Sequence, residues 1–215
     1  MKNLSESQLR LVQRSLFVLA VLPFLYHSSR GVFASLENPV EYLTRASGDW
    51  ALRLLLLTLL MTPLKRLTGW TFWIRLRRTL GLFTFFYASV HFLIYVLLDV
   101  ALNADITARE LFNHIVEDIT KRPYITVGFT AFILLIPLAW TSRRSWQRRL
   151  GTAWKKLHRL VYLIAVLAVL HFYWLVKLDK SEPIVYAILF AIVLMSRWIT
   201  PAFANRFYAR EKKSA

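Results

Sequence analysis

Residues Leu160 to Val176 read LVYLIAVLAVLHFYWLV, an apolar run with one histidine and no formal charge. This composition is typical of a helix that crosses a lipid bilayer, which needs about 20 mainly apolar residues. Comparable uncharged runs cover Ser15 to Ser29, Leu54 to Leu64, Thr79 to Leu98, Pro123 to Ser142 and Pro183 to Ser196. The sequence therefore predicts an all-α fold, a polytopic membrane helix bundle with six transmembrane helices in a single domain over residues 1–215.

Two of these runs reach spanning length only if they include an arginine. The run at Leu54 must begin near Ser47 and carry Arg53 in its first turns, and the last run must extend to Arg197. Both arginines can still reach the polar interface, because a long side chain near the end of a span extends its guanidinium toward water. We therefore keep both segments as predicted spans.

The composition limits the chemistry that this chain can perform. Hydrophobic residues make up 57% of its 215 residues, the mean hydropathy is +0.45 and cysteine is absent. Without cysteine, the chain forms no disulfide, no covalent haem attachment of the c type, no iron–sulfur cluster and no thiolate zinc site. The apolar runs leave no room for a separate catalytic domain or a nucleotide-binding fold, and no glycine-rich phosphate loop is present. Any metal site must use histidine, methionine or carboxylate ligands, and use of a nicotinamide cofactor requires another protein.

The net charge of +16 would suggest nucleic acid binding in a soluble protein, but the charges follow a membrane pattern. With the N-terminus in the cytoplasm, the inner side holds 20 Lys and Arg and two Asp and Glu, whereas the outer side holds eight and ten. This positive-inside bias predicts that both termini are cytoplasmic. The basic loops at residues 65–78 and 143–159 are expected to contact anionic membrane lipid rather than nucleic acid.

The first apolar run has a second interpretation, as a cleaved signal peptide. Lys2, Arg10 and Arg14 precede the run, and Val32-Phe33-Ala34 follows it, as a signal sequence requires. Cleavage would leave five spans and would not change the orientation of the rest.

The longest external segment runs from Asp99 to Arg122. Within it, residues 108–119 place apolar side chains at helical spacing, which predicts a short amphipathic surface helix. No internal repeat and no low-complexity segment is evident in the sequence.

Histidine is the candidate ligand type, and the pair His91 and His171 is the strongest candidate. His91 lies thirteen residues beyond Arg78, and His171 lies thirteen beyond His158, each on a helix predicted to run outward. At 1.5 Å per residue, both lie about 20 Å from the inner boundary. Two histidines at one depth on different helices can bind the two faces of a haem iron. Alternatively, each only hydrogen-bonds a neighbouring helix; zinc is less favoured because no third ligand lies at that level.

His158 lies at the inner boundary of its predicted span. At the same level, the other outward-running helix carries Arg77 and Arg78, so the sequence supplies no second histidine pair there. His158 and His171 are also about 220° apart on a helical wheel and should face different neighbours. A second haem with one histidine and another ligand stays open.

Arginines near the membrane faces are candidate partners for haem propionates, because a guanidinium matches a carboxylate. Arg53 is the outer candidate, and Arg77 and Arg78 are the inner ones. Extension of each side chain toward the interface is an equally good interpretation. His27, two residues before the end of the first apolar run, and His114, in the external segment, are both interpreted as surface residues.

Several motifs, taken in order, carry a family resemblance. They are Leu22-Pro23-Phe24, Thr62-Pro63-Leu64, Ile74 to Gly81, Ser89-Val90-His91, Lys121 to Gly128 and Gly151 to Trp174. Their order and spacing resemble the MsrQ family, the haem-binding membrane subunits of bacterial protein-methionine-sulfoxide reductase systems within the ferric-reductase-like transmembrane group. The resemblance implies a b-type cytochrome in the bacterial inner membrane, with heme b and FMN as cofactors and with His91, His158 and His171 as the haem-associated histidines.

The resemblance also implies an electron route. Electrons would come from the quinone pool, with a cytosolic flavin reductase as a further donor, and would pass to a periplasmic molybdopterin-containing subunit that reduces methionine sulfoxide. Catalysis on the sulfoxide would thus occur in the partner, docked on the segment from Asp99 to Arg122. The membrane potential favours outward electron movement by about 2.3 kcal/mol per 100 mV. Two alternatives stay open: a self-sufficient ferric or quinone reductase, and a transporter or assembly scaffold without haem.

Overall fold

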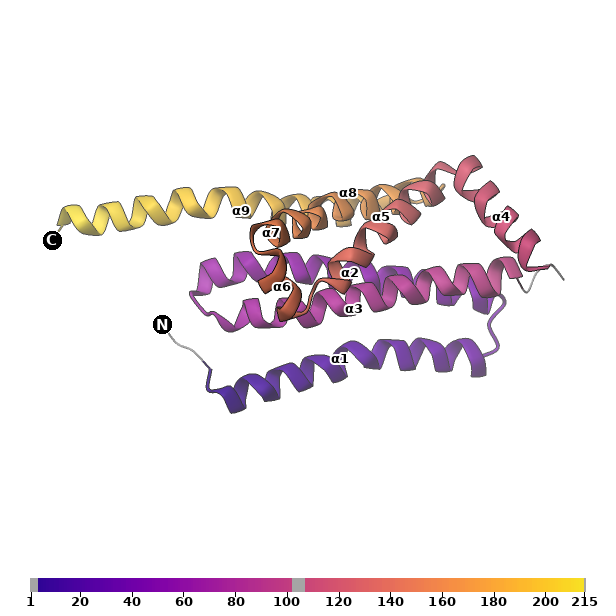
Figure 1. Ribbon diagram of the computed structural model, residues 1–215, viewed down its shortest axis with the longest axis horizontal. Helices are drawn as coiled ribbons and strands as arrows, with labels where there is room; N and C mark the ends of the chain where they lie inside the picture. The colour runs from indigo at the N-terminus through magenta and orange to yellow at the C-terminus, as the bar shows by residue number, and fades with distance from the viewer. Residues whose placement is uncertain (1–3, 102–106, 215) are drawn as a thin grey trace.

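The computed structural model describes residues 4–101 and 107–214, and every regular element in these ranges is helical (Figure 1). The elements are α1 (Glu6–Phe33), α2 (Pro39–Thr68), α3 (Phe72–Ile94) with the π-helical extension η1 (Tyr95–Ala101), α4 (Ala108–Lys121), α5 (Pro123–Trp140), α6 (Arg144–Leu150), α7 (Thr152–His158), α8 (Leu160–Leu175) and α9 (Ser181–Ser214). These ranges contain no β-strand, so the predicted all-α fold is confirmed.

The long helices lie side by side in one elongated bundle (Figure 1). α2 and α3 form an antiparallel hairpin with the most extensive contact, α5 and α8 form a second pair, and α9 packs along α2. α1 contacts both α2 and α3. The amphipathic helix α4 lies across one end, where the sequence predicted such a helix at residues 108–119.

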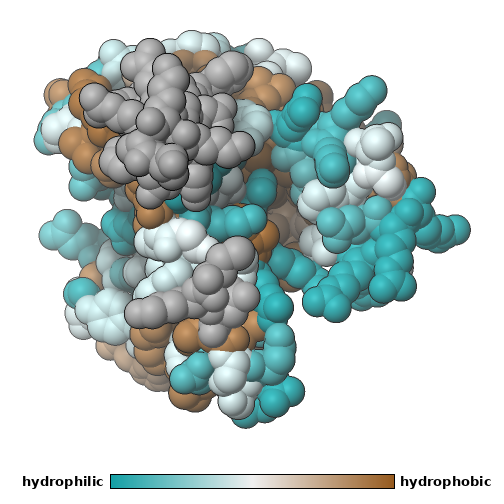
Figure 2. Space-filling model, turned by 90° about the vertical axis from the view of Figure 1, so that its left-hand side faces the viewer, coloured by the Kyte–Doolittle hydropathy of each residue, from teal (hydrophilic) through white to brown (hydrophobic). Residues whose placement is uncertain are grey.

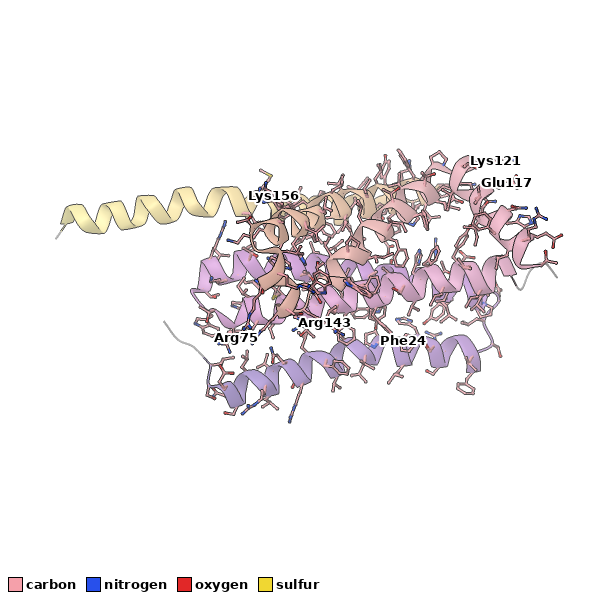
Figure 3. The ribbon with its side chains drawn as sticks, in the orientation of Figure 1. Phe24, Arg75, Glu117, Lys121, Arg143 and Lys156 are labelled. Atoms are coloured by element: carbon pink, nitrogen blue, oxygen red, sulfur yellow. The ribbon has the colours of Figure 1, made fainter. Side chains whose placement is uncertain are left out.

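Charge distinguishes the two ends of the bundle. The end opposite α4, which we call the basic end, holds residues 4–14, 65–78 and 143–159. Figure 3 shows Arg75, Arg143 and Lys156 toward this end and Glu117 and Lys121 on α4, and Figure 2 shows hydrophilic side chains gathered over the basic end.

On α4, Lys121 donates to Glu117 over 2.5 Å, and this hydrogen bond holds the pKa of the exposed Glu117 carboxyl below its usual value.

Among the described residues, four helical segments are long and apolar enough to cross a membrane: Glu6–Phe33, Phe72–Leu98, Pro123–Trp140 and Thr152–Leu175. Large apolar side chains cover the outside of the bundle, including Phe17, Leu22, Ile133, Val166, Ile188 and Ile192. Such a surface is unfavourable in water and suits contact with lipid chains. The structure thus supports a multi-pass membrane protein. The remaining two predicted spans lie on α2 and α9; the six-span count and the cytoplasmic termini stay predictions.

Two apolar clusters hold the bundle together, and α2 contributes to both. One cluster joins α2 to α5, α8 and α9 around Leu59, whose exposure is 0%. The other joins α1, α2 and α3 around the buried Tyr87, whose hydroxyl donates to the Ala20 carbonyl over 2.8 Å. α2 ends at Gly69, where a positive φ of 74° lets the chain turn directly into α3. α2 is therefore the common element against which α3 and α8 are positioned.

Candidate functional site

Two histidines that are 80 residues apart in the sequence face each other inside the bundle. His91 on α3 and His171 on α8 have ring centroids 6.2 Å apart, and their ring planes cross at 82°. The common depth predicted from the sequence is thus matched by side chains that point toward one another. Neither helix could supply this pair alone, because it depends on how the α2–α3 and α5–α8 pairs pack.

Each ring is held by a backbone carbonyl of a neighbouring helix. His91 Nδ1 lies 2.9 Å from the Thr44 carbonyl oxygen, and His171 Nδ1 lies 2.6 Å from that of Tyr124. A carbonyl oxygen only accepts, so Nδ1 must carry the proton and donate in both cases. Each Nε2 then keeps its lone pair, which is the arrangement found in histidines that bind a metal through Nε2.

Glycine leaves the space that each ring occupies. A Cβ atom at Gly48 would lie 3.1 Å from His91 Nδ1, and one at Gly128 would lie 2.6 Å from His171 Nδ1. Both contacts are shorter than ordinary packing allows, so each imidazole rests against bare helix backbone.

The two half-sites share one sequence spacing. The residue whose carbonyl accepts the hydrogen bond, Thr44 or Tyr124, precedes its glycine by four residues, and the histidine follows that glycine by 43 residues. The α2–α3 and α5–α8 pairs therefore contain a structural repeat around the site. Apart from this spacing, the sequence gives no evident sign of the repeat, because most of the other side chains differ between the two pairs.

Aromatic side chains follow both histidines in the chain and pack across helices. Phe92, next to His91, stacks on Phe132 of α5 at 5.0 Å and lies 5.8 Å from Phe129, and Phe85 stacks on Phe132 at 6.1 Å. Phe172, next to His171, contacts Tyr186 of α9, and the Tyr124 ring lies 6.3 Å from the His171 ring. Apolar and aromatic side chains thus adjoin both histidines along their helices.

The geometry of the pair fits a haem iron held on both faces. A metal–imidazole bond of about 2 Å on each side, plus about 1 Å from each bonded nitrogen to its ring centre, separates two axial ring centres by about 6 Å. The observed separation is 6.2 Å. The described residues contain no group of three or more His, Cys, Asp or Glu that could hold a metal ion. Two facing imidazoles thus suit a metal whose other ligands come from a macrocycle.

Comparison with known proteins points to the same kind of protein. Residues 47–169 match the family model described as ferric reductase like transmembrane component. A protein of Xanthomonas campestris pv. campestris (strain B100), named protein-methionine-sulfoxide reductase heme-binding subunit MsrQ, is 52% identical over 173 residues, which cover 80% of this chain and 76% of that protein. A protein of the same name from Herminiimonas arsenicoxydans is 44% identical over 200 residues, covering 90% and 87%. This chain belongs to the MsrQ family.

The third candidate histidine of this MsrQ-family chain lies apart from the pair. His158, at the end of α7, stacks on Trp154 at 4.0 Å, and its Nε2 lies 3.1 Å from Thr141 Oγ1. The Thr141 hydroxyl donates its own hydrogen to the Pro137 carbonyl, so His158 Nε2 must be the donor to Thr141. The lone pair of His158 is then on Nδ1. The structure brings no second histidine to this position among the described residues.

None of the candidate arginines contacts the histidine pair in a hydrogen bond. Arg53 donates from Nε to the Tyr186 hydroxyl over 3.0 Å, approaches Asp49 at 3.5 Å and lines a cavity of about 570 Å³ between α2 and α9. Arg77 is half-buried toward the basic end, close enough to His158 to repel a positive charge there, and Arg78 is exposed. The structure thus gives Arg53 partners of its own and places Arg77 near His158.

The interpretation of His27 as a surface residue needs correction. Its ring is half-buried between α1 and α2, where Trp50 Nε1 donates to His27 Nε2 over 3.3 Å. Nδ1 must then carry the proton and donate to the Tyr42 hydroxyl oxygen over 2.6 Å. His27 therefore joins α1 to α2, which helix spacing alone does not reveal. His114 is exposed on α4, as expected.

The sequence analysis missed the residues that hold the pair. Gly48 and the Thr44 and Tyr124 carbonyls carry no signal in composition or charge. The shared spacing of a glycine four residues after the carbonyl and 43 before the histidine would have found them.

Replacing Gly128 with alanine should displace the His171 ring. The new methyl group would lie 2.6 Å from Nδ1, so the hydrogen bond to Tyr124 must lengthen or break. Gly→Ala within a helix ordinarily stabilises by about 1 kcal/mol. We nevertheless expect a lower midpoint of thermal unfolding in detergent.

The matched control is Gly81→Ala. Its new Cβ would meet the nearest neighbour at an ordinary 3.7 Å, so this variant should leave the midpoint unchanged or higher. Equal midpoints for the two variants would contradict the close packing of His171.

Proposed function

We propose that this chain is the haem-binding membrane subunit of a protein-methionine-sulfoxide reductase system and that His91 and His171 are the axial ligands of one heme b. The observation that carries the proposal is the facing pair of rings at 6.2 Å, each with Nδ1 bound to a backbone carbonyl. Membership of the MsrQ family supports it, because the two relatives described above are named heme-binding subunits.

The residues around the pair determine what kind of haem site this is. A haem supplies a one-electron iron couple. The hydrogen bonds from His91 and His171 to backbone carbonyls fix the orientation of each ring. They also make each Nε2 a stronger electron-pair donor toward a metal. Histidine on both faces leaves no coordination position for a substrate, which favours electron transfer over chemistry at the metal. The phenylalanines of α3 and α5 limit the access of water.

The decisive test uses haem content and optical spectra. His91→Ala and His171→Ala should each remove the low-spin haem signal from reduced-minus-oxidised spectra, because the iron loses one of two axial ligands. His114→Ala, on the exposed face of α4, should retain the haem-to-protein ratio of the parent. An unchanged low-spin spectrum in either pair variant would remove that ligand assignment. A parent protein without a Soret band, after expression with ample haem, would favour the transporter or scaffold interpretation.

We further propose an outward electron route. Electrons from the quinone pool, or from a cytosolic flavin reductase, would reach the haem and leave for a periplasmic molybdopterin-containing subunit, where methionine sulfoxide is reduced. Family membership and the positive charge of the basic end support this direction, since the basic end would face the cytoplasm of a bacterial inner membrane. We assign His158 to a second cofactor, a further haem or FMN, at the inner side. The segment containing α4 would face the periplasmic partner.

The orientation can be tested directly because the chain has no cysteine. Ser35→Cys lies between α1 and α2, Ser145→Cys lies on α6, and both positions are exposed. In intact spheroplasts, a membrane-impermeant maleimide should label Ser35→Cys, and it should label Ser145→Cys only after the membrane is permeabilised. The opposite labelling pattern would reverse the proposed electron direction.

Dependence on the partner separates this proposal from a self-sufficient reductase. Membranes that contain this chain should support quinol-driven reduction of protein-bound methionine sulfoxide only when the periplasmic subunit is present. The same membranes without that subunit should show no ferric or quinone reductase turnover above membranes that carry the His91→Ala variant. Haem-dependent ferric reduction that persists without the subunit would favour the self-sufficient reductase.

A further inference from the structure

Cationic side chains from several helices converge near the basic end. Arg197 of α9 donates to the Tyr162 hydroxyl of α8 over 2.6 Å and also to the Leu59 carbonyl of α2. Arg66 of α2 in turn donates to the Arg197 carbonyl over 2.5 Å. Arg77 of α3 lies near enough to Arg197 to repel its charge. The cluster therefore joins α2, α3, α8 and α9.

This cluster contains hydrogen-bonding atoms that the described protein does not satisfy. The Arg197 Nε–H and the Thr62 hydroxyl are both buried and have no hydrogen-bond partner. Thr62 lies on α2 between Leu59 and Arg66, the two residues that bond to Arg197. Buried polar atoms nearly always have a partner, so two such donors in one place indicate a ligand that accepts hydrogen bonds.

No carboxylate balances the cluster among the side chains that the structure describes, which end at Arg197 on α9. Within residues 4–14, 65–78 and 143–159, Glu6 is the one acidic side chain, and it pairs with Arg75 over 2.7 Å. Half-buried Arg77 forms no hydrogen bond or ion pair with another described residue. Bringing guanidinium groups together away from water is unfavourable unless an anion lies between them.

We propose that Arg77 and Arg197 bind the phosphate of an acidic phospholipid between α3, α8 and α9. A phosphate accepts several hydrogen bonds and matches the forked guanidinium. It would therefore satisfy the Arg197 Nε–H and the Thr62 hydroxyl, which have no partner within the described protein. The lipid source follows from the adjacent surface: Leu163, next to Tyr162, and Met195, two residues before Arg197, are 48% and 59% exposed. These apolar side chains would lie along the acyl chains of a lipid whose headgroup reaches the cluster.

The test measures retained lipid by native mass spectrometry of the full chain extracted in mild detergent from vesicles of phosphatidylglycerol and phosphatidylcholine. The parent should retain phosphatidylglycerol in preference to phosphatidylcholine. Arg77→Gln should reduce retention about fivefold or more, as expected for one basic residue at an anionic surface. Arg159→Gln is the matched control, because Arg159 is exposed one residue beyond α7 and contributes only surface charge, so it should lower retention less than Arg77→Gln does. An equal loss in the two variants would assign retention to surface charge alone and overturn the proposal.

Two further variants separate lipid binding from a structural role of Arg197. Arg197→Gln should lower retention, whereas Tyr162→Phe, which removes the hydrogen bond but no charge, should not. Equal retention in the parent, Arg77→Gln and Arg159→Gln would overturn the proposal. Thermal stabilisation of the delipidated parent by inorganic phosphate, with no added effect of phosphatidylglycerol, would overturn the lipid source. All of these results are independent of haem content, so failure here leaves the haem proposal intact.

Discussion

In a bilayer, the N–H group of a buried imidazole must find its acceptor within the protein, because lipid chains offer none. The carbonyls of Thr44 and Tyr124 meet this requirement for His91 and His171. The same two bonds select the Nδ1–H tautomer and direct both Nε2 atoms away from the helices that hold the rings. The chemistry of the site therefore depends on where four helices place two carbonyl oxygens.

The site is built twice, once from α2 and α3 and once from α5 and α8. In each pair, a glycine lets the imidazole rest on helix backbone, and the carbonyl one turn earlier accepts a hydrogen bond from Nδ1. Two copies of such a half-site bring two imidazole rings to within 6.2 Å of each other, which a single helix pair cannot do. α2 connects the halves, because it packs on α3 and also shares an apolar cluster with α5 and α8.

We assign two roles to the charges of the basic end. By the positive-inside bias, its excess of lysine and arginine predicts that this end faces the cytoplasm. Where some of these cations are half-buried between helices, as at Arg77 and Arg197, their positive charge also requires a compensating anion. In our proposal, a membrane rich in acidic lipid would supply that anion at the depth where the helices end. Topology and lipid binding would then follow from one distribution of charge.

The sequence alone determined the helical class, the absence of cysteine chemistry, the charge asymmetry and the equal depth of His91 and His171, because each follows from composition or from a fixed rise per residue. It also determined the family, through motifs spread over the chain. It misplaced His27, which bonds to Tyr42 and Trp50, and it did not reveal the repeated half-site. Only the tertiary structure decided that the two imidazoles face each other at 6.2 Å, which carbonyl holds each ring and which arginines gather without a carboxylate. Backbone carbonyls have the same chemistry at every residue, so neither composition nor charge marks the two that these histidines use.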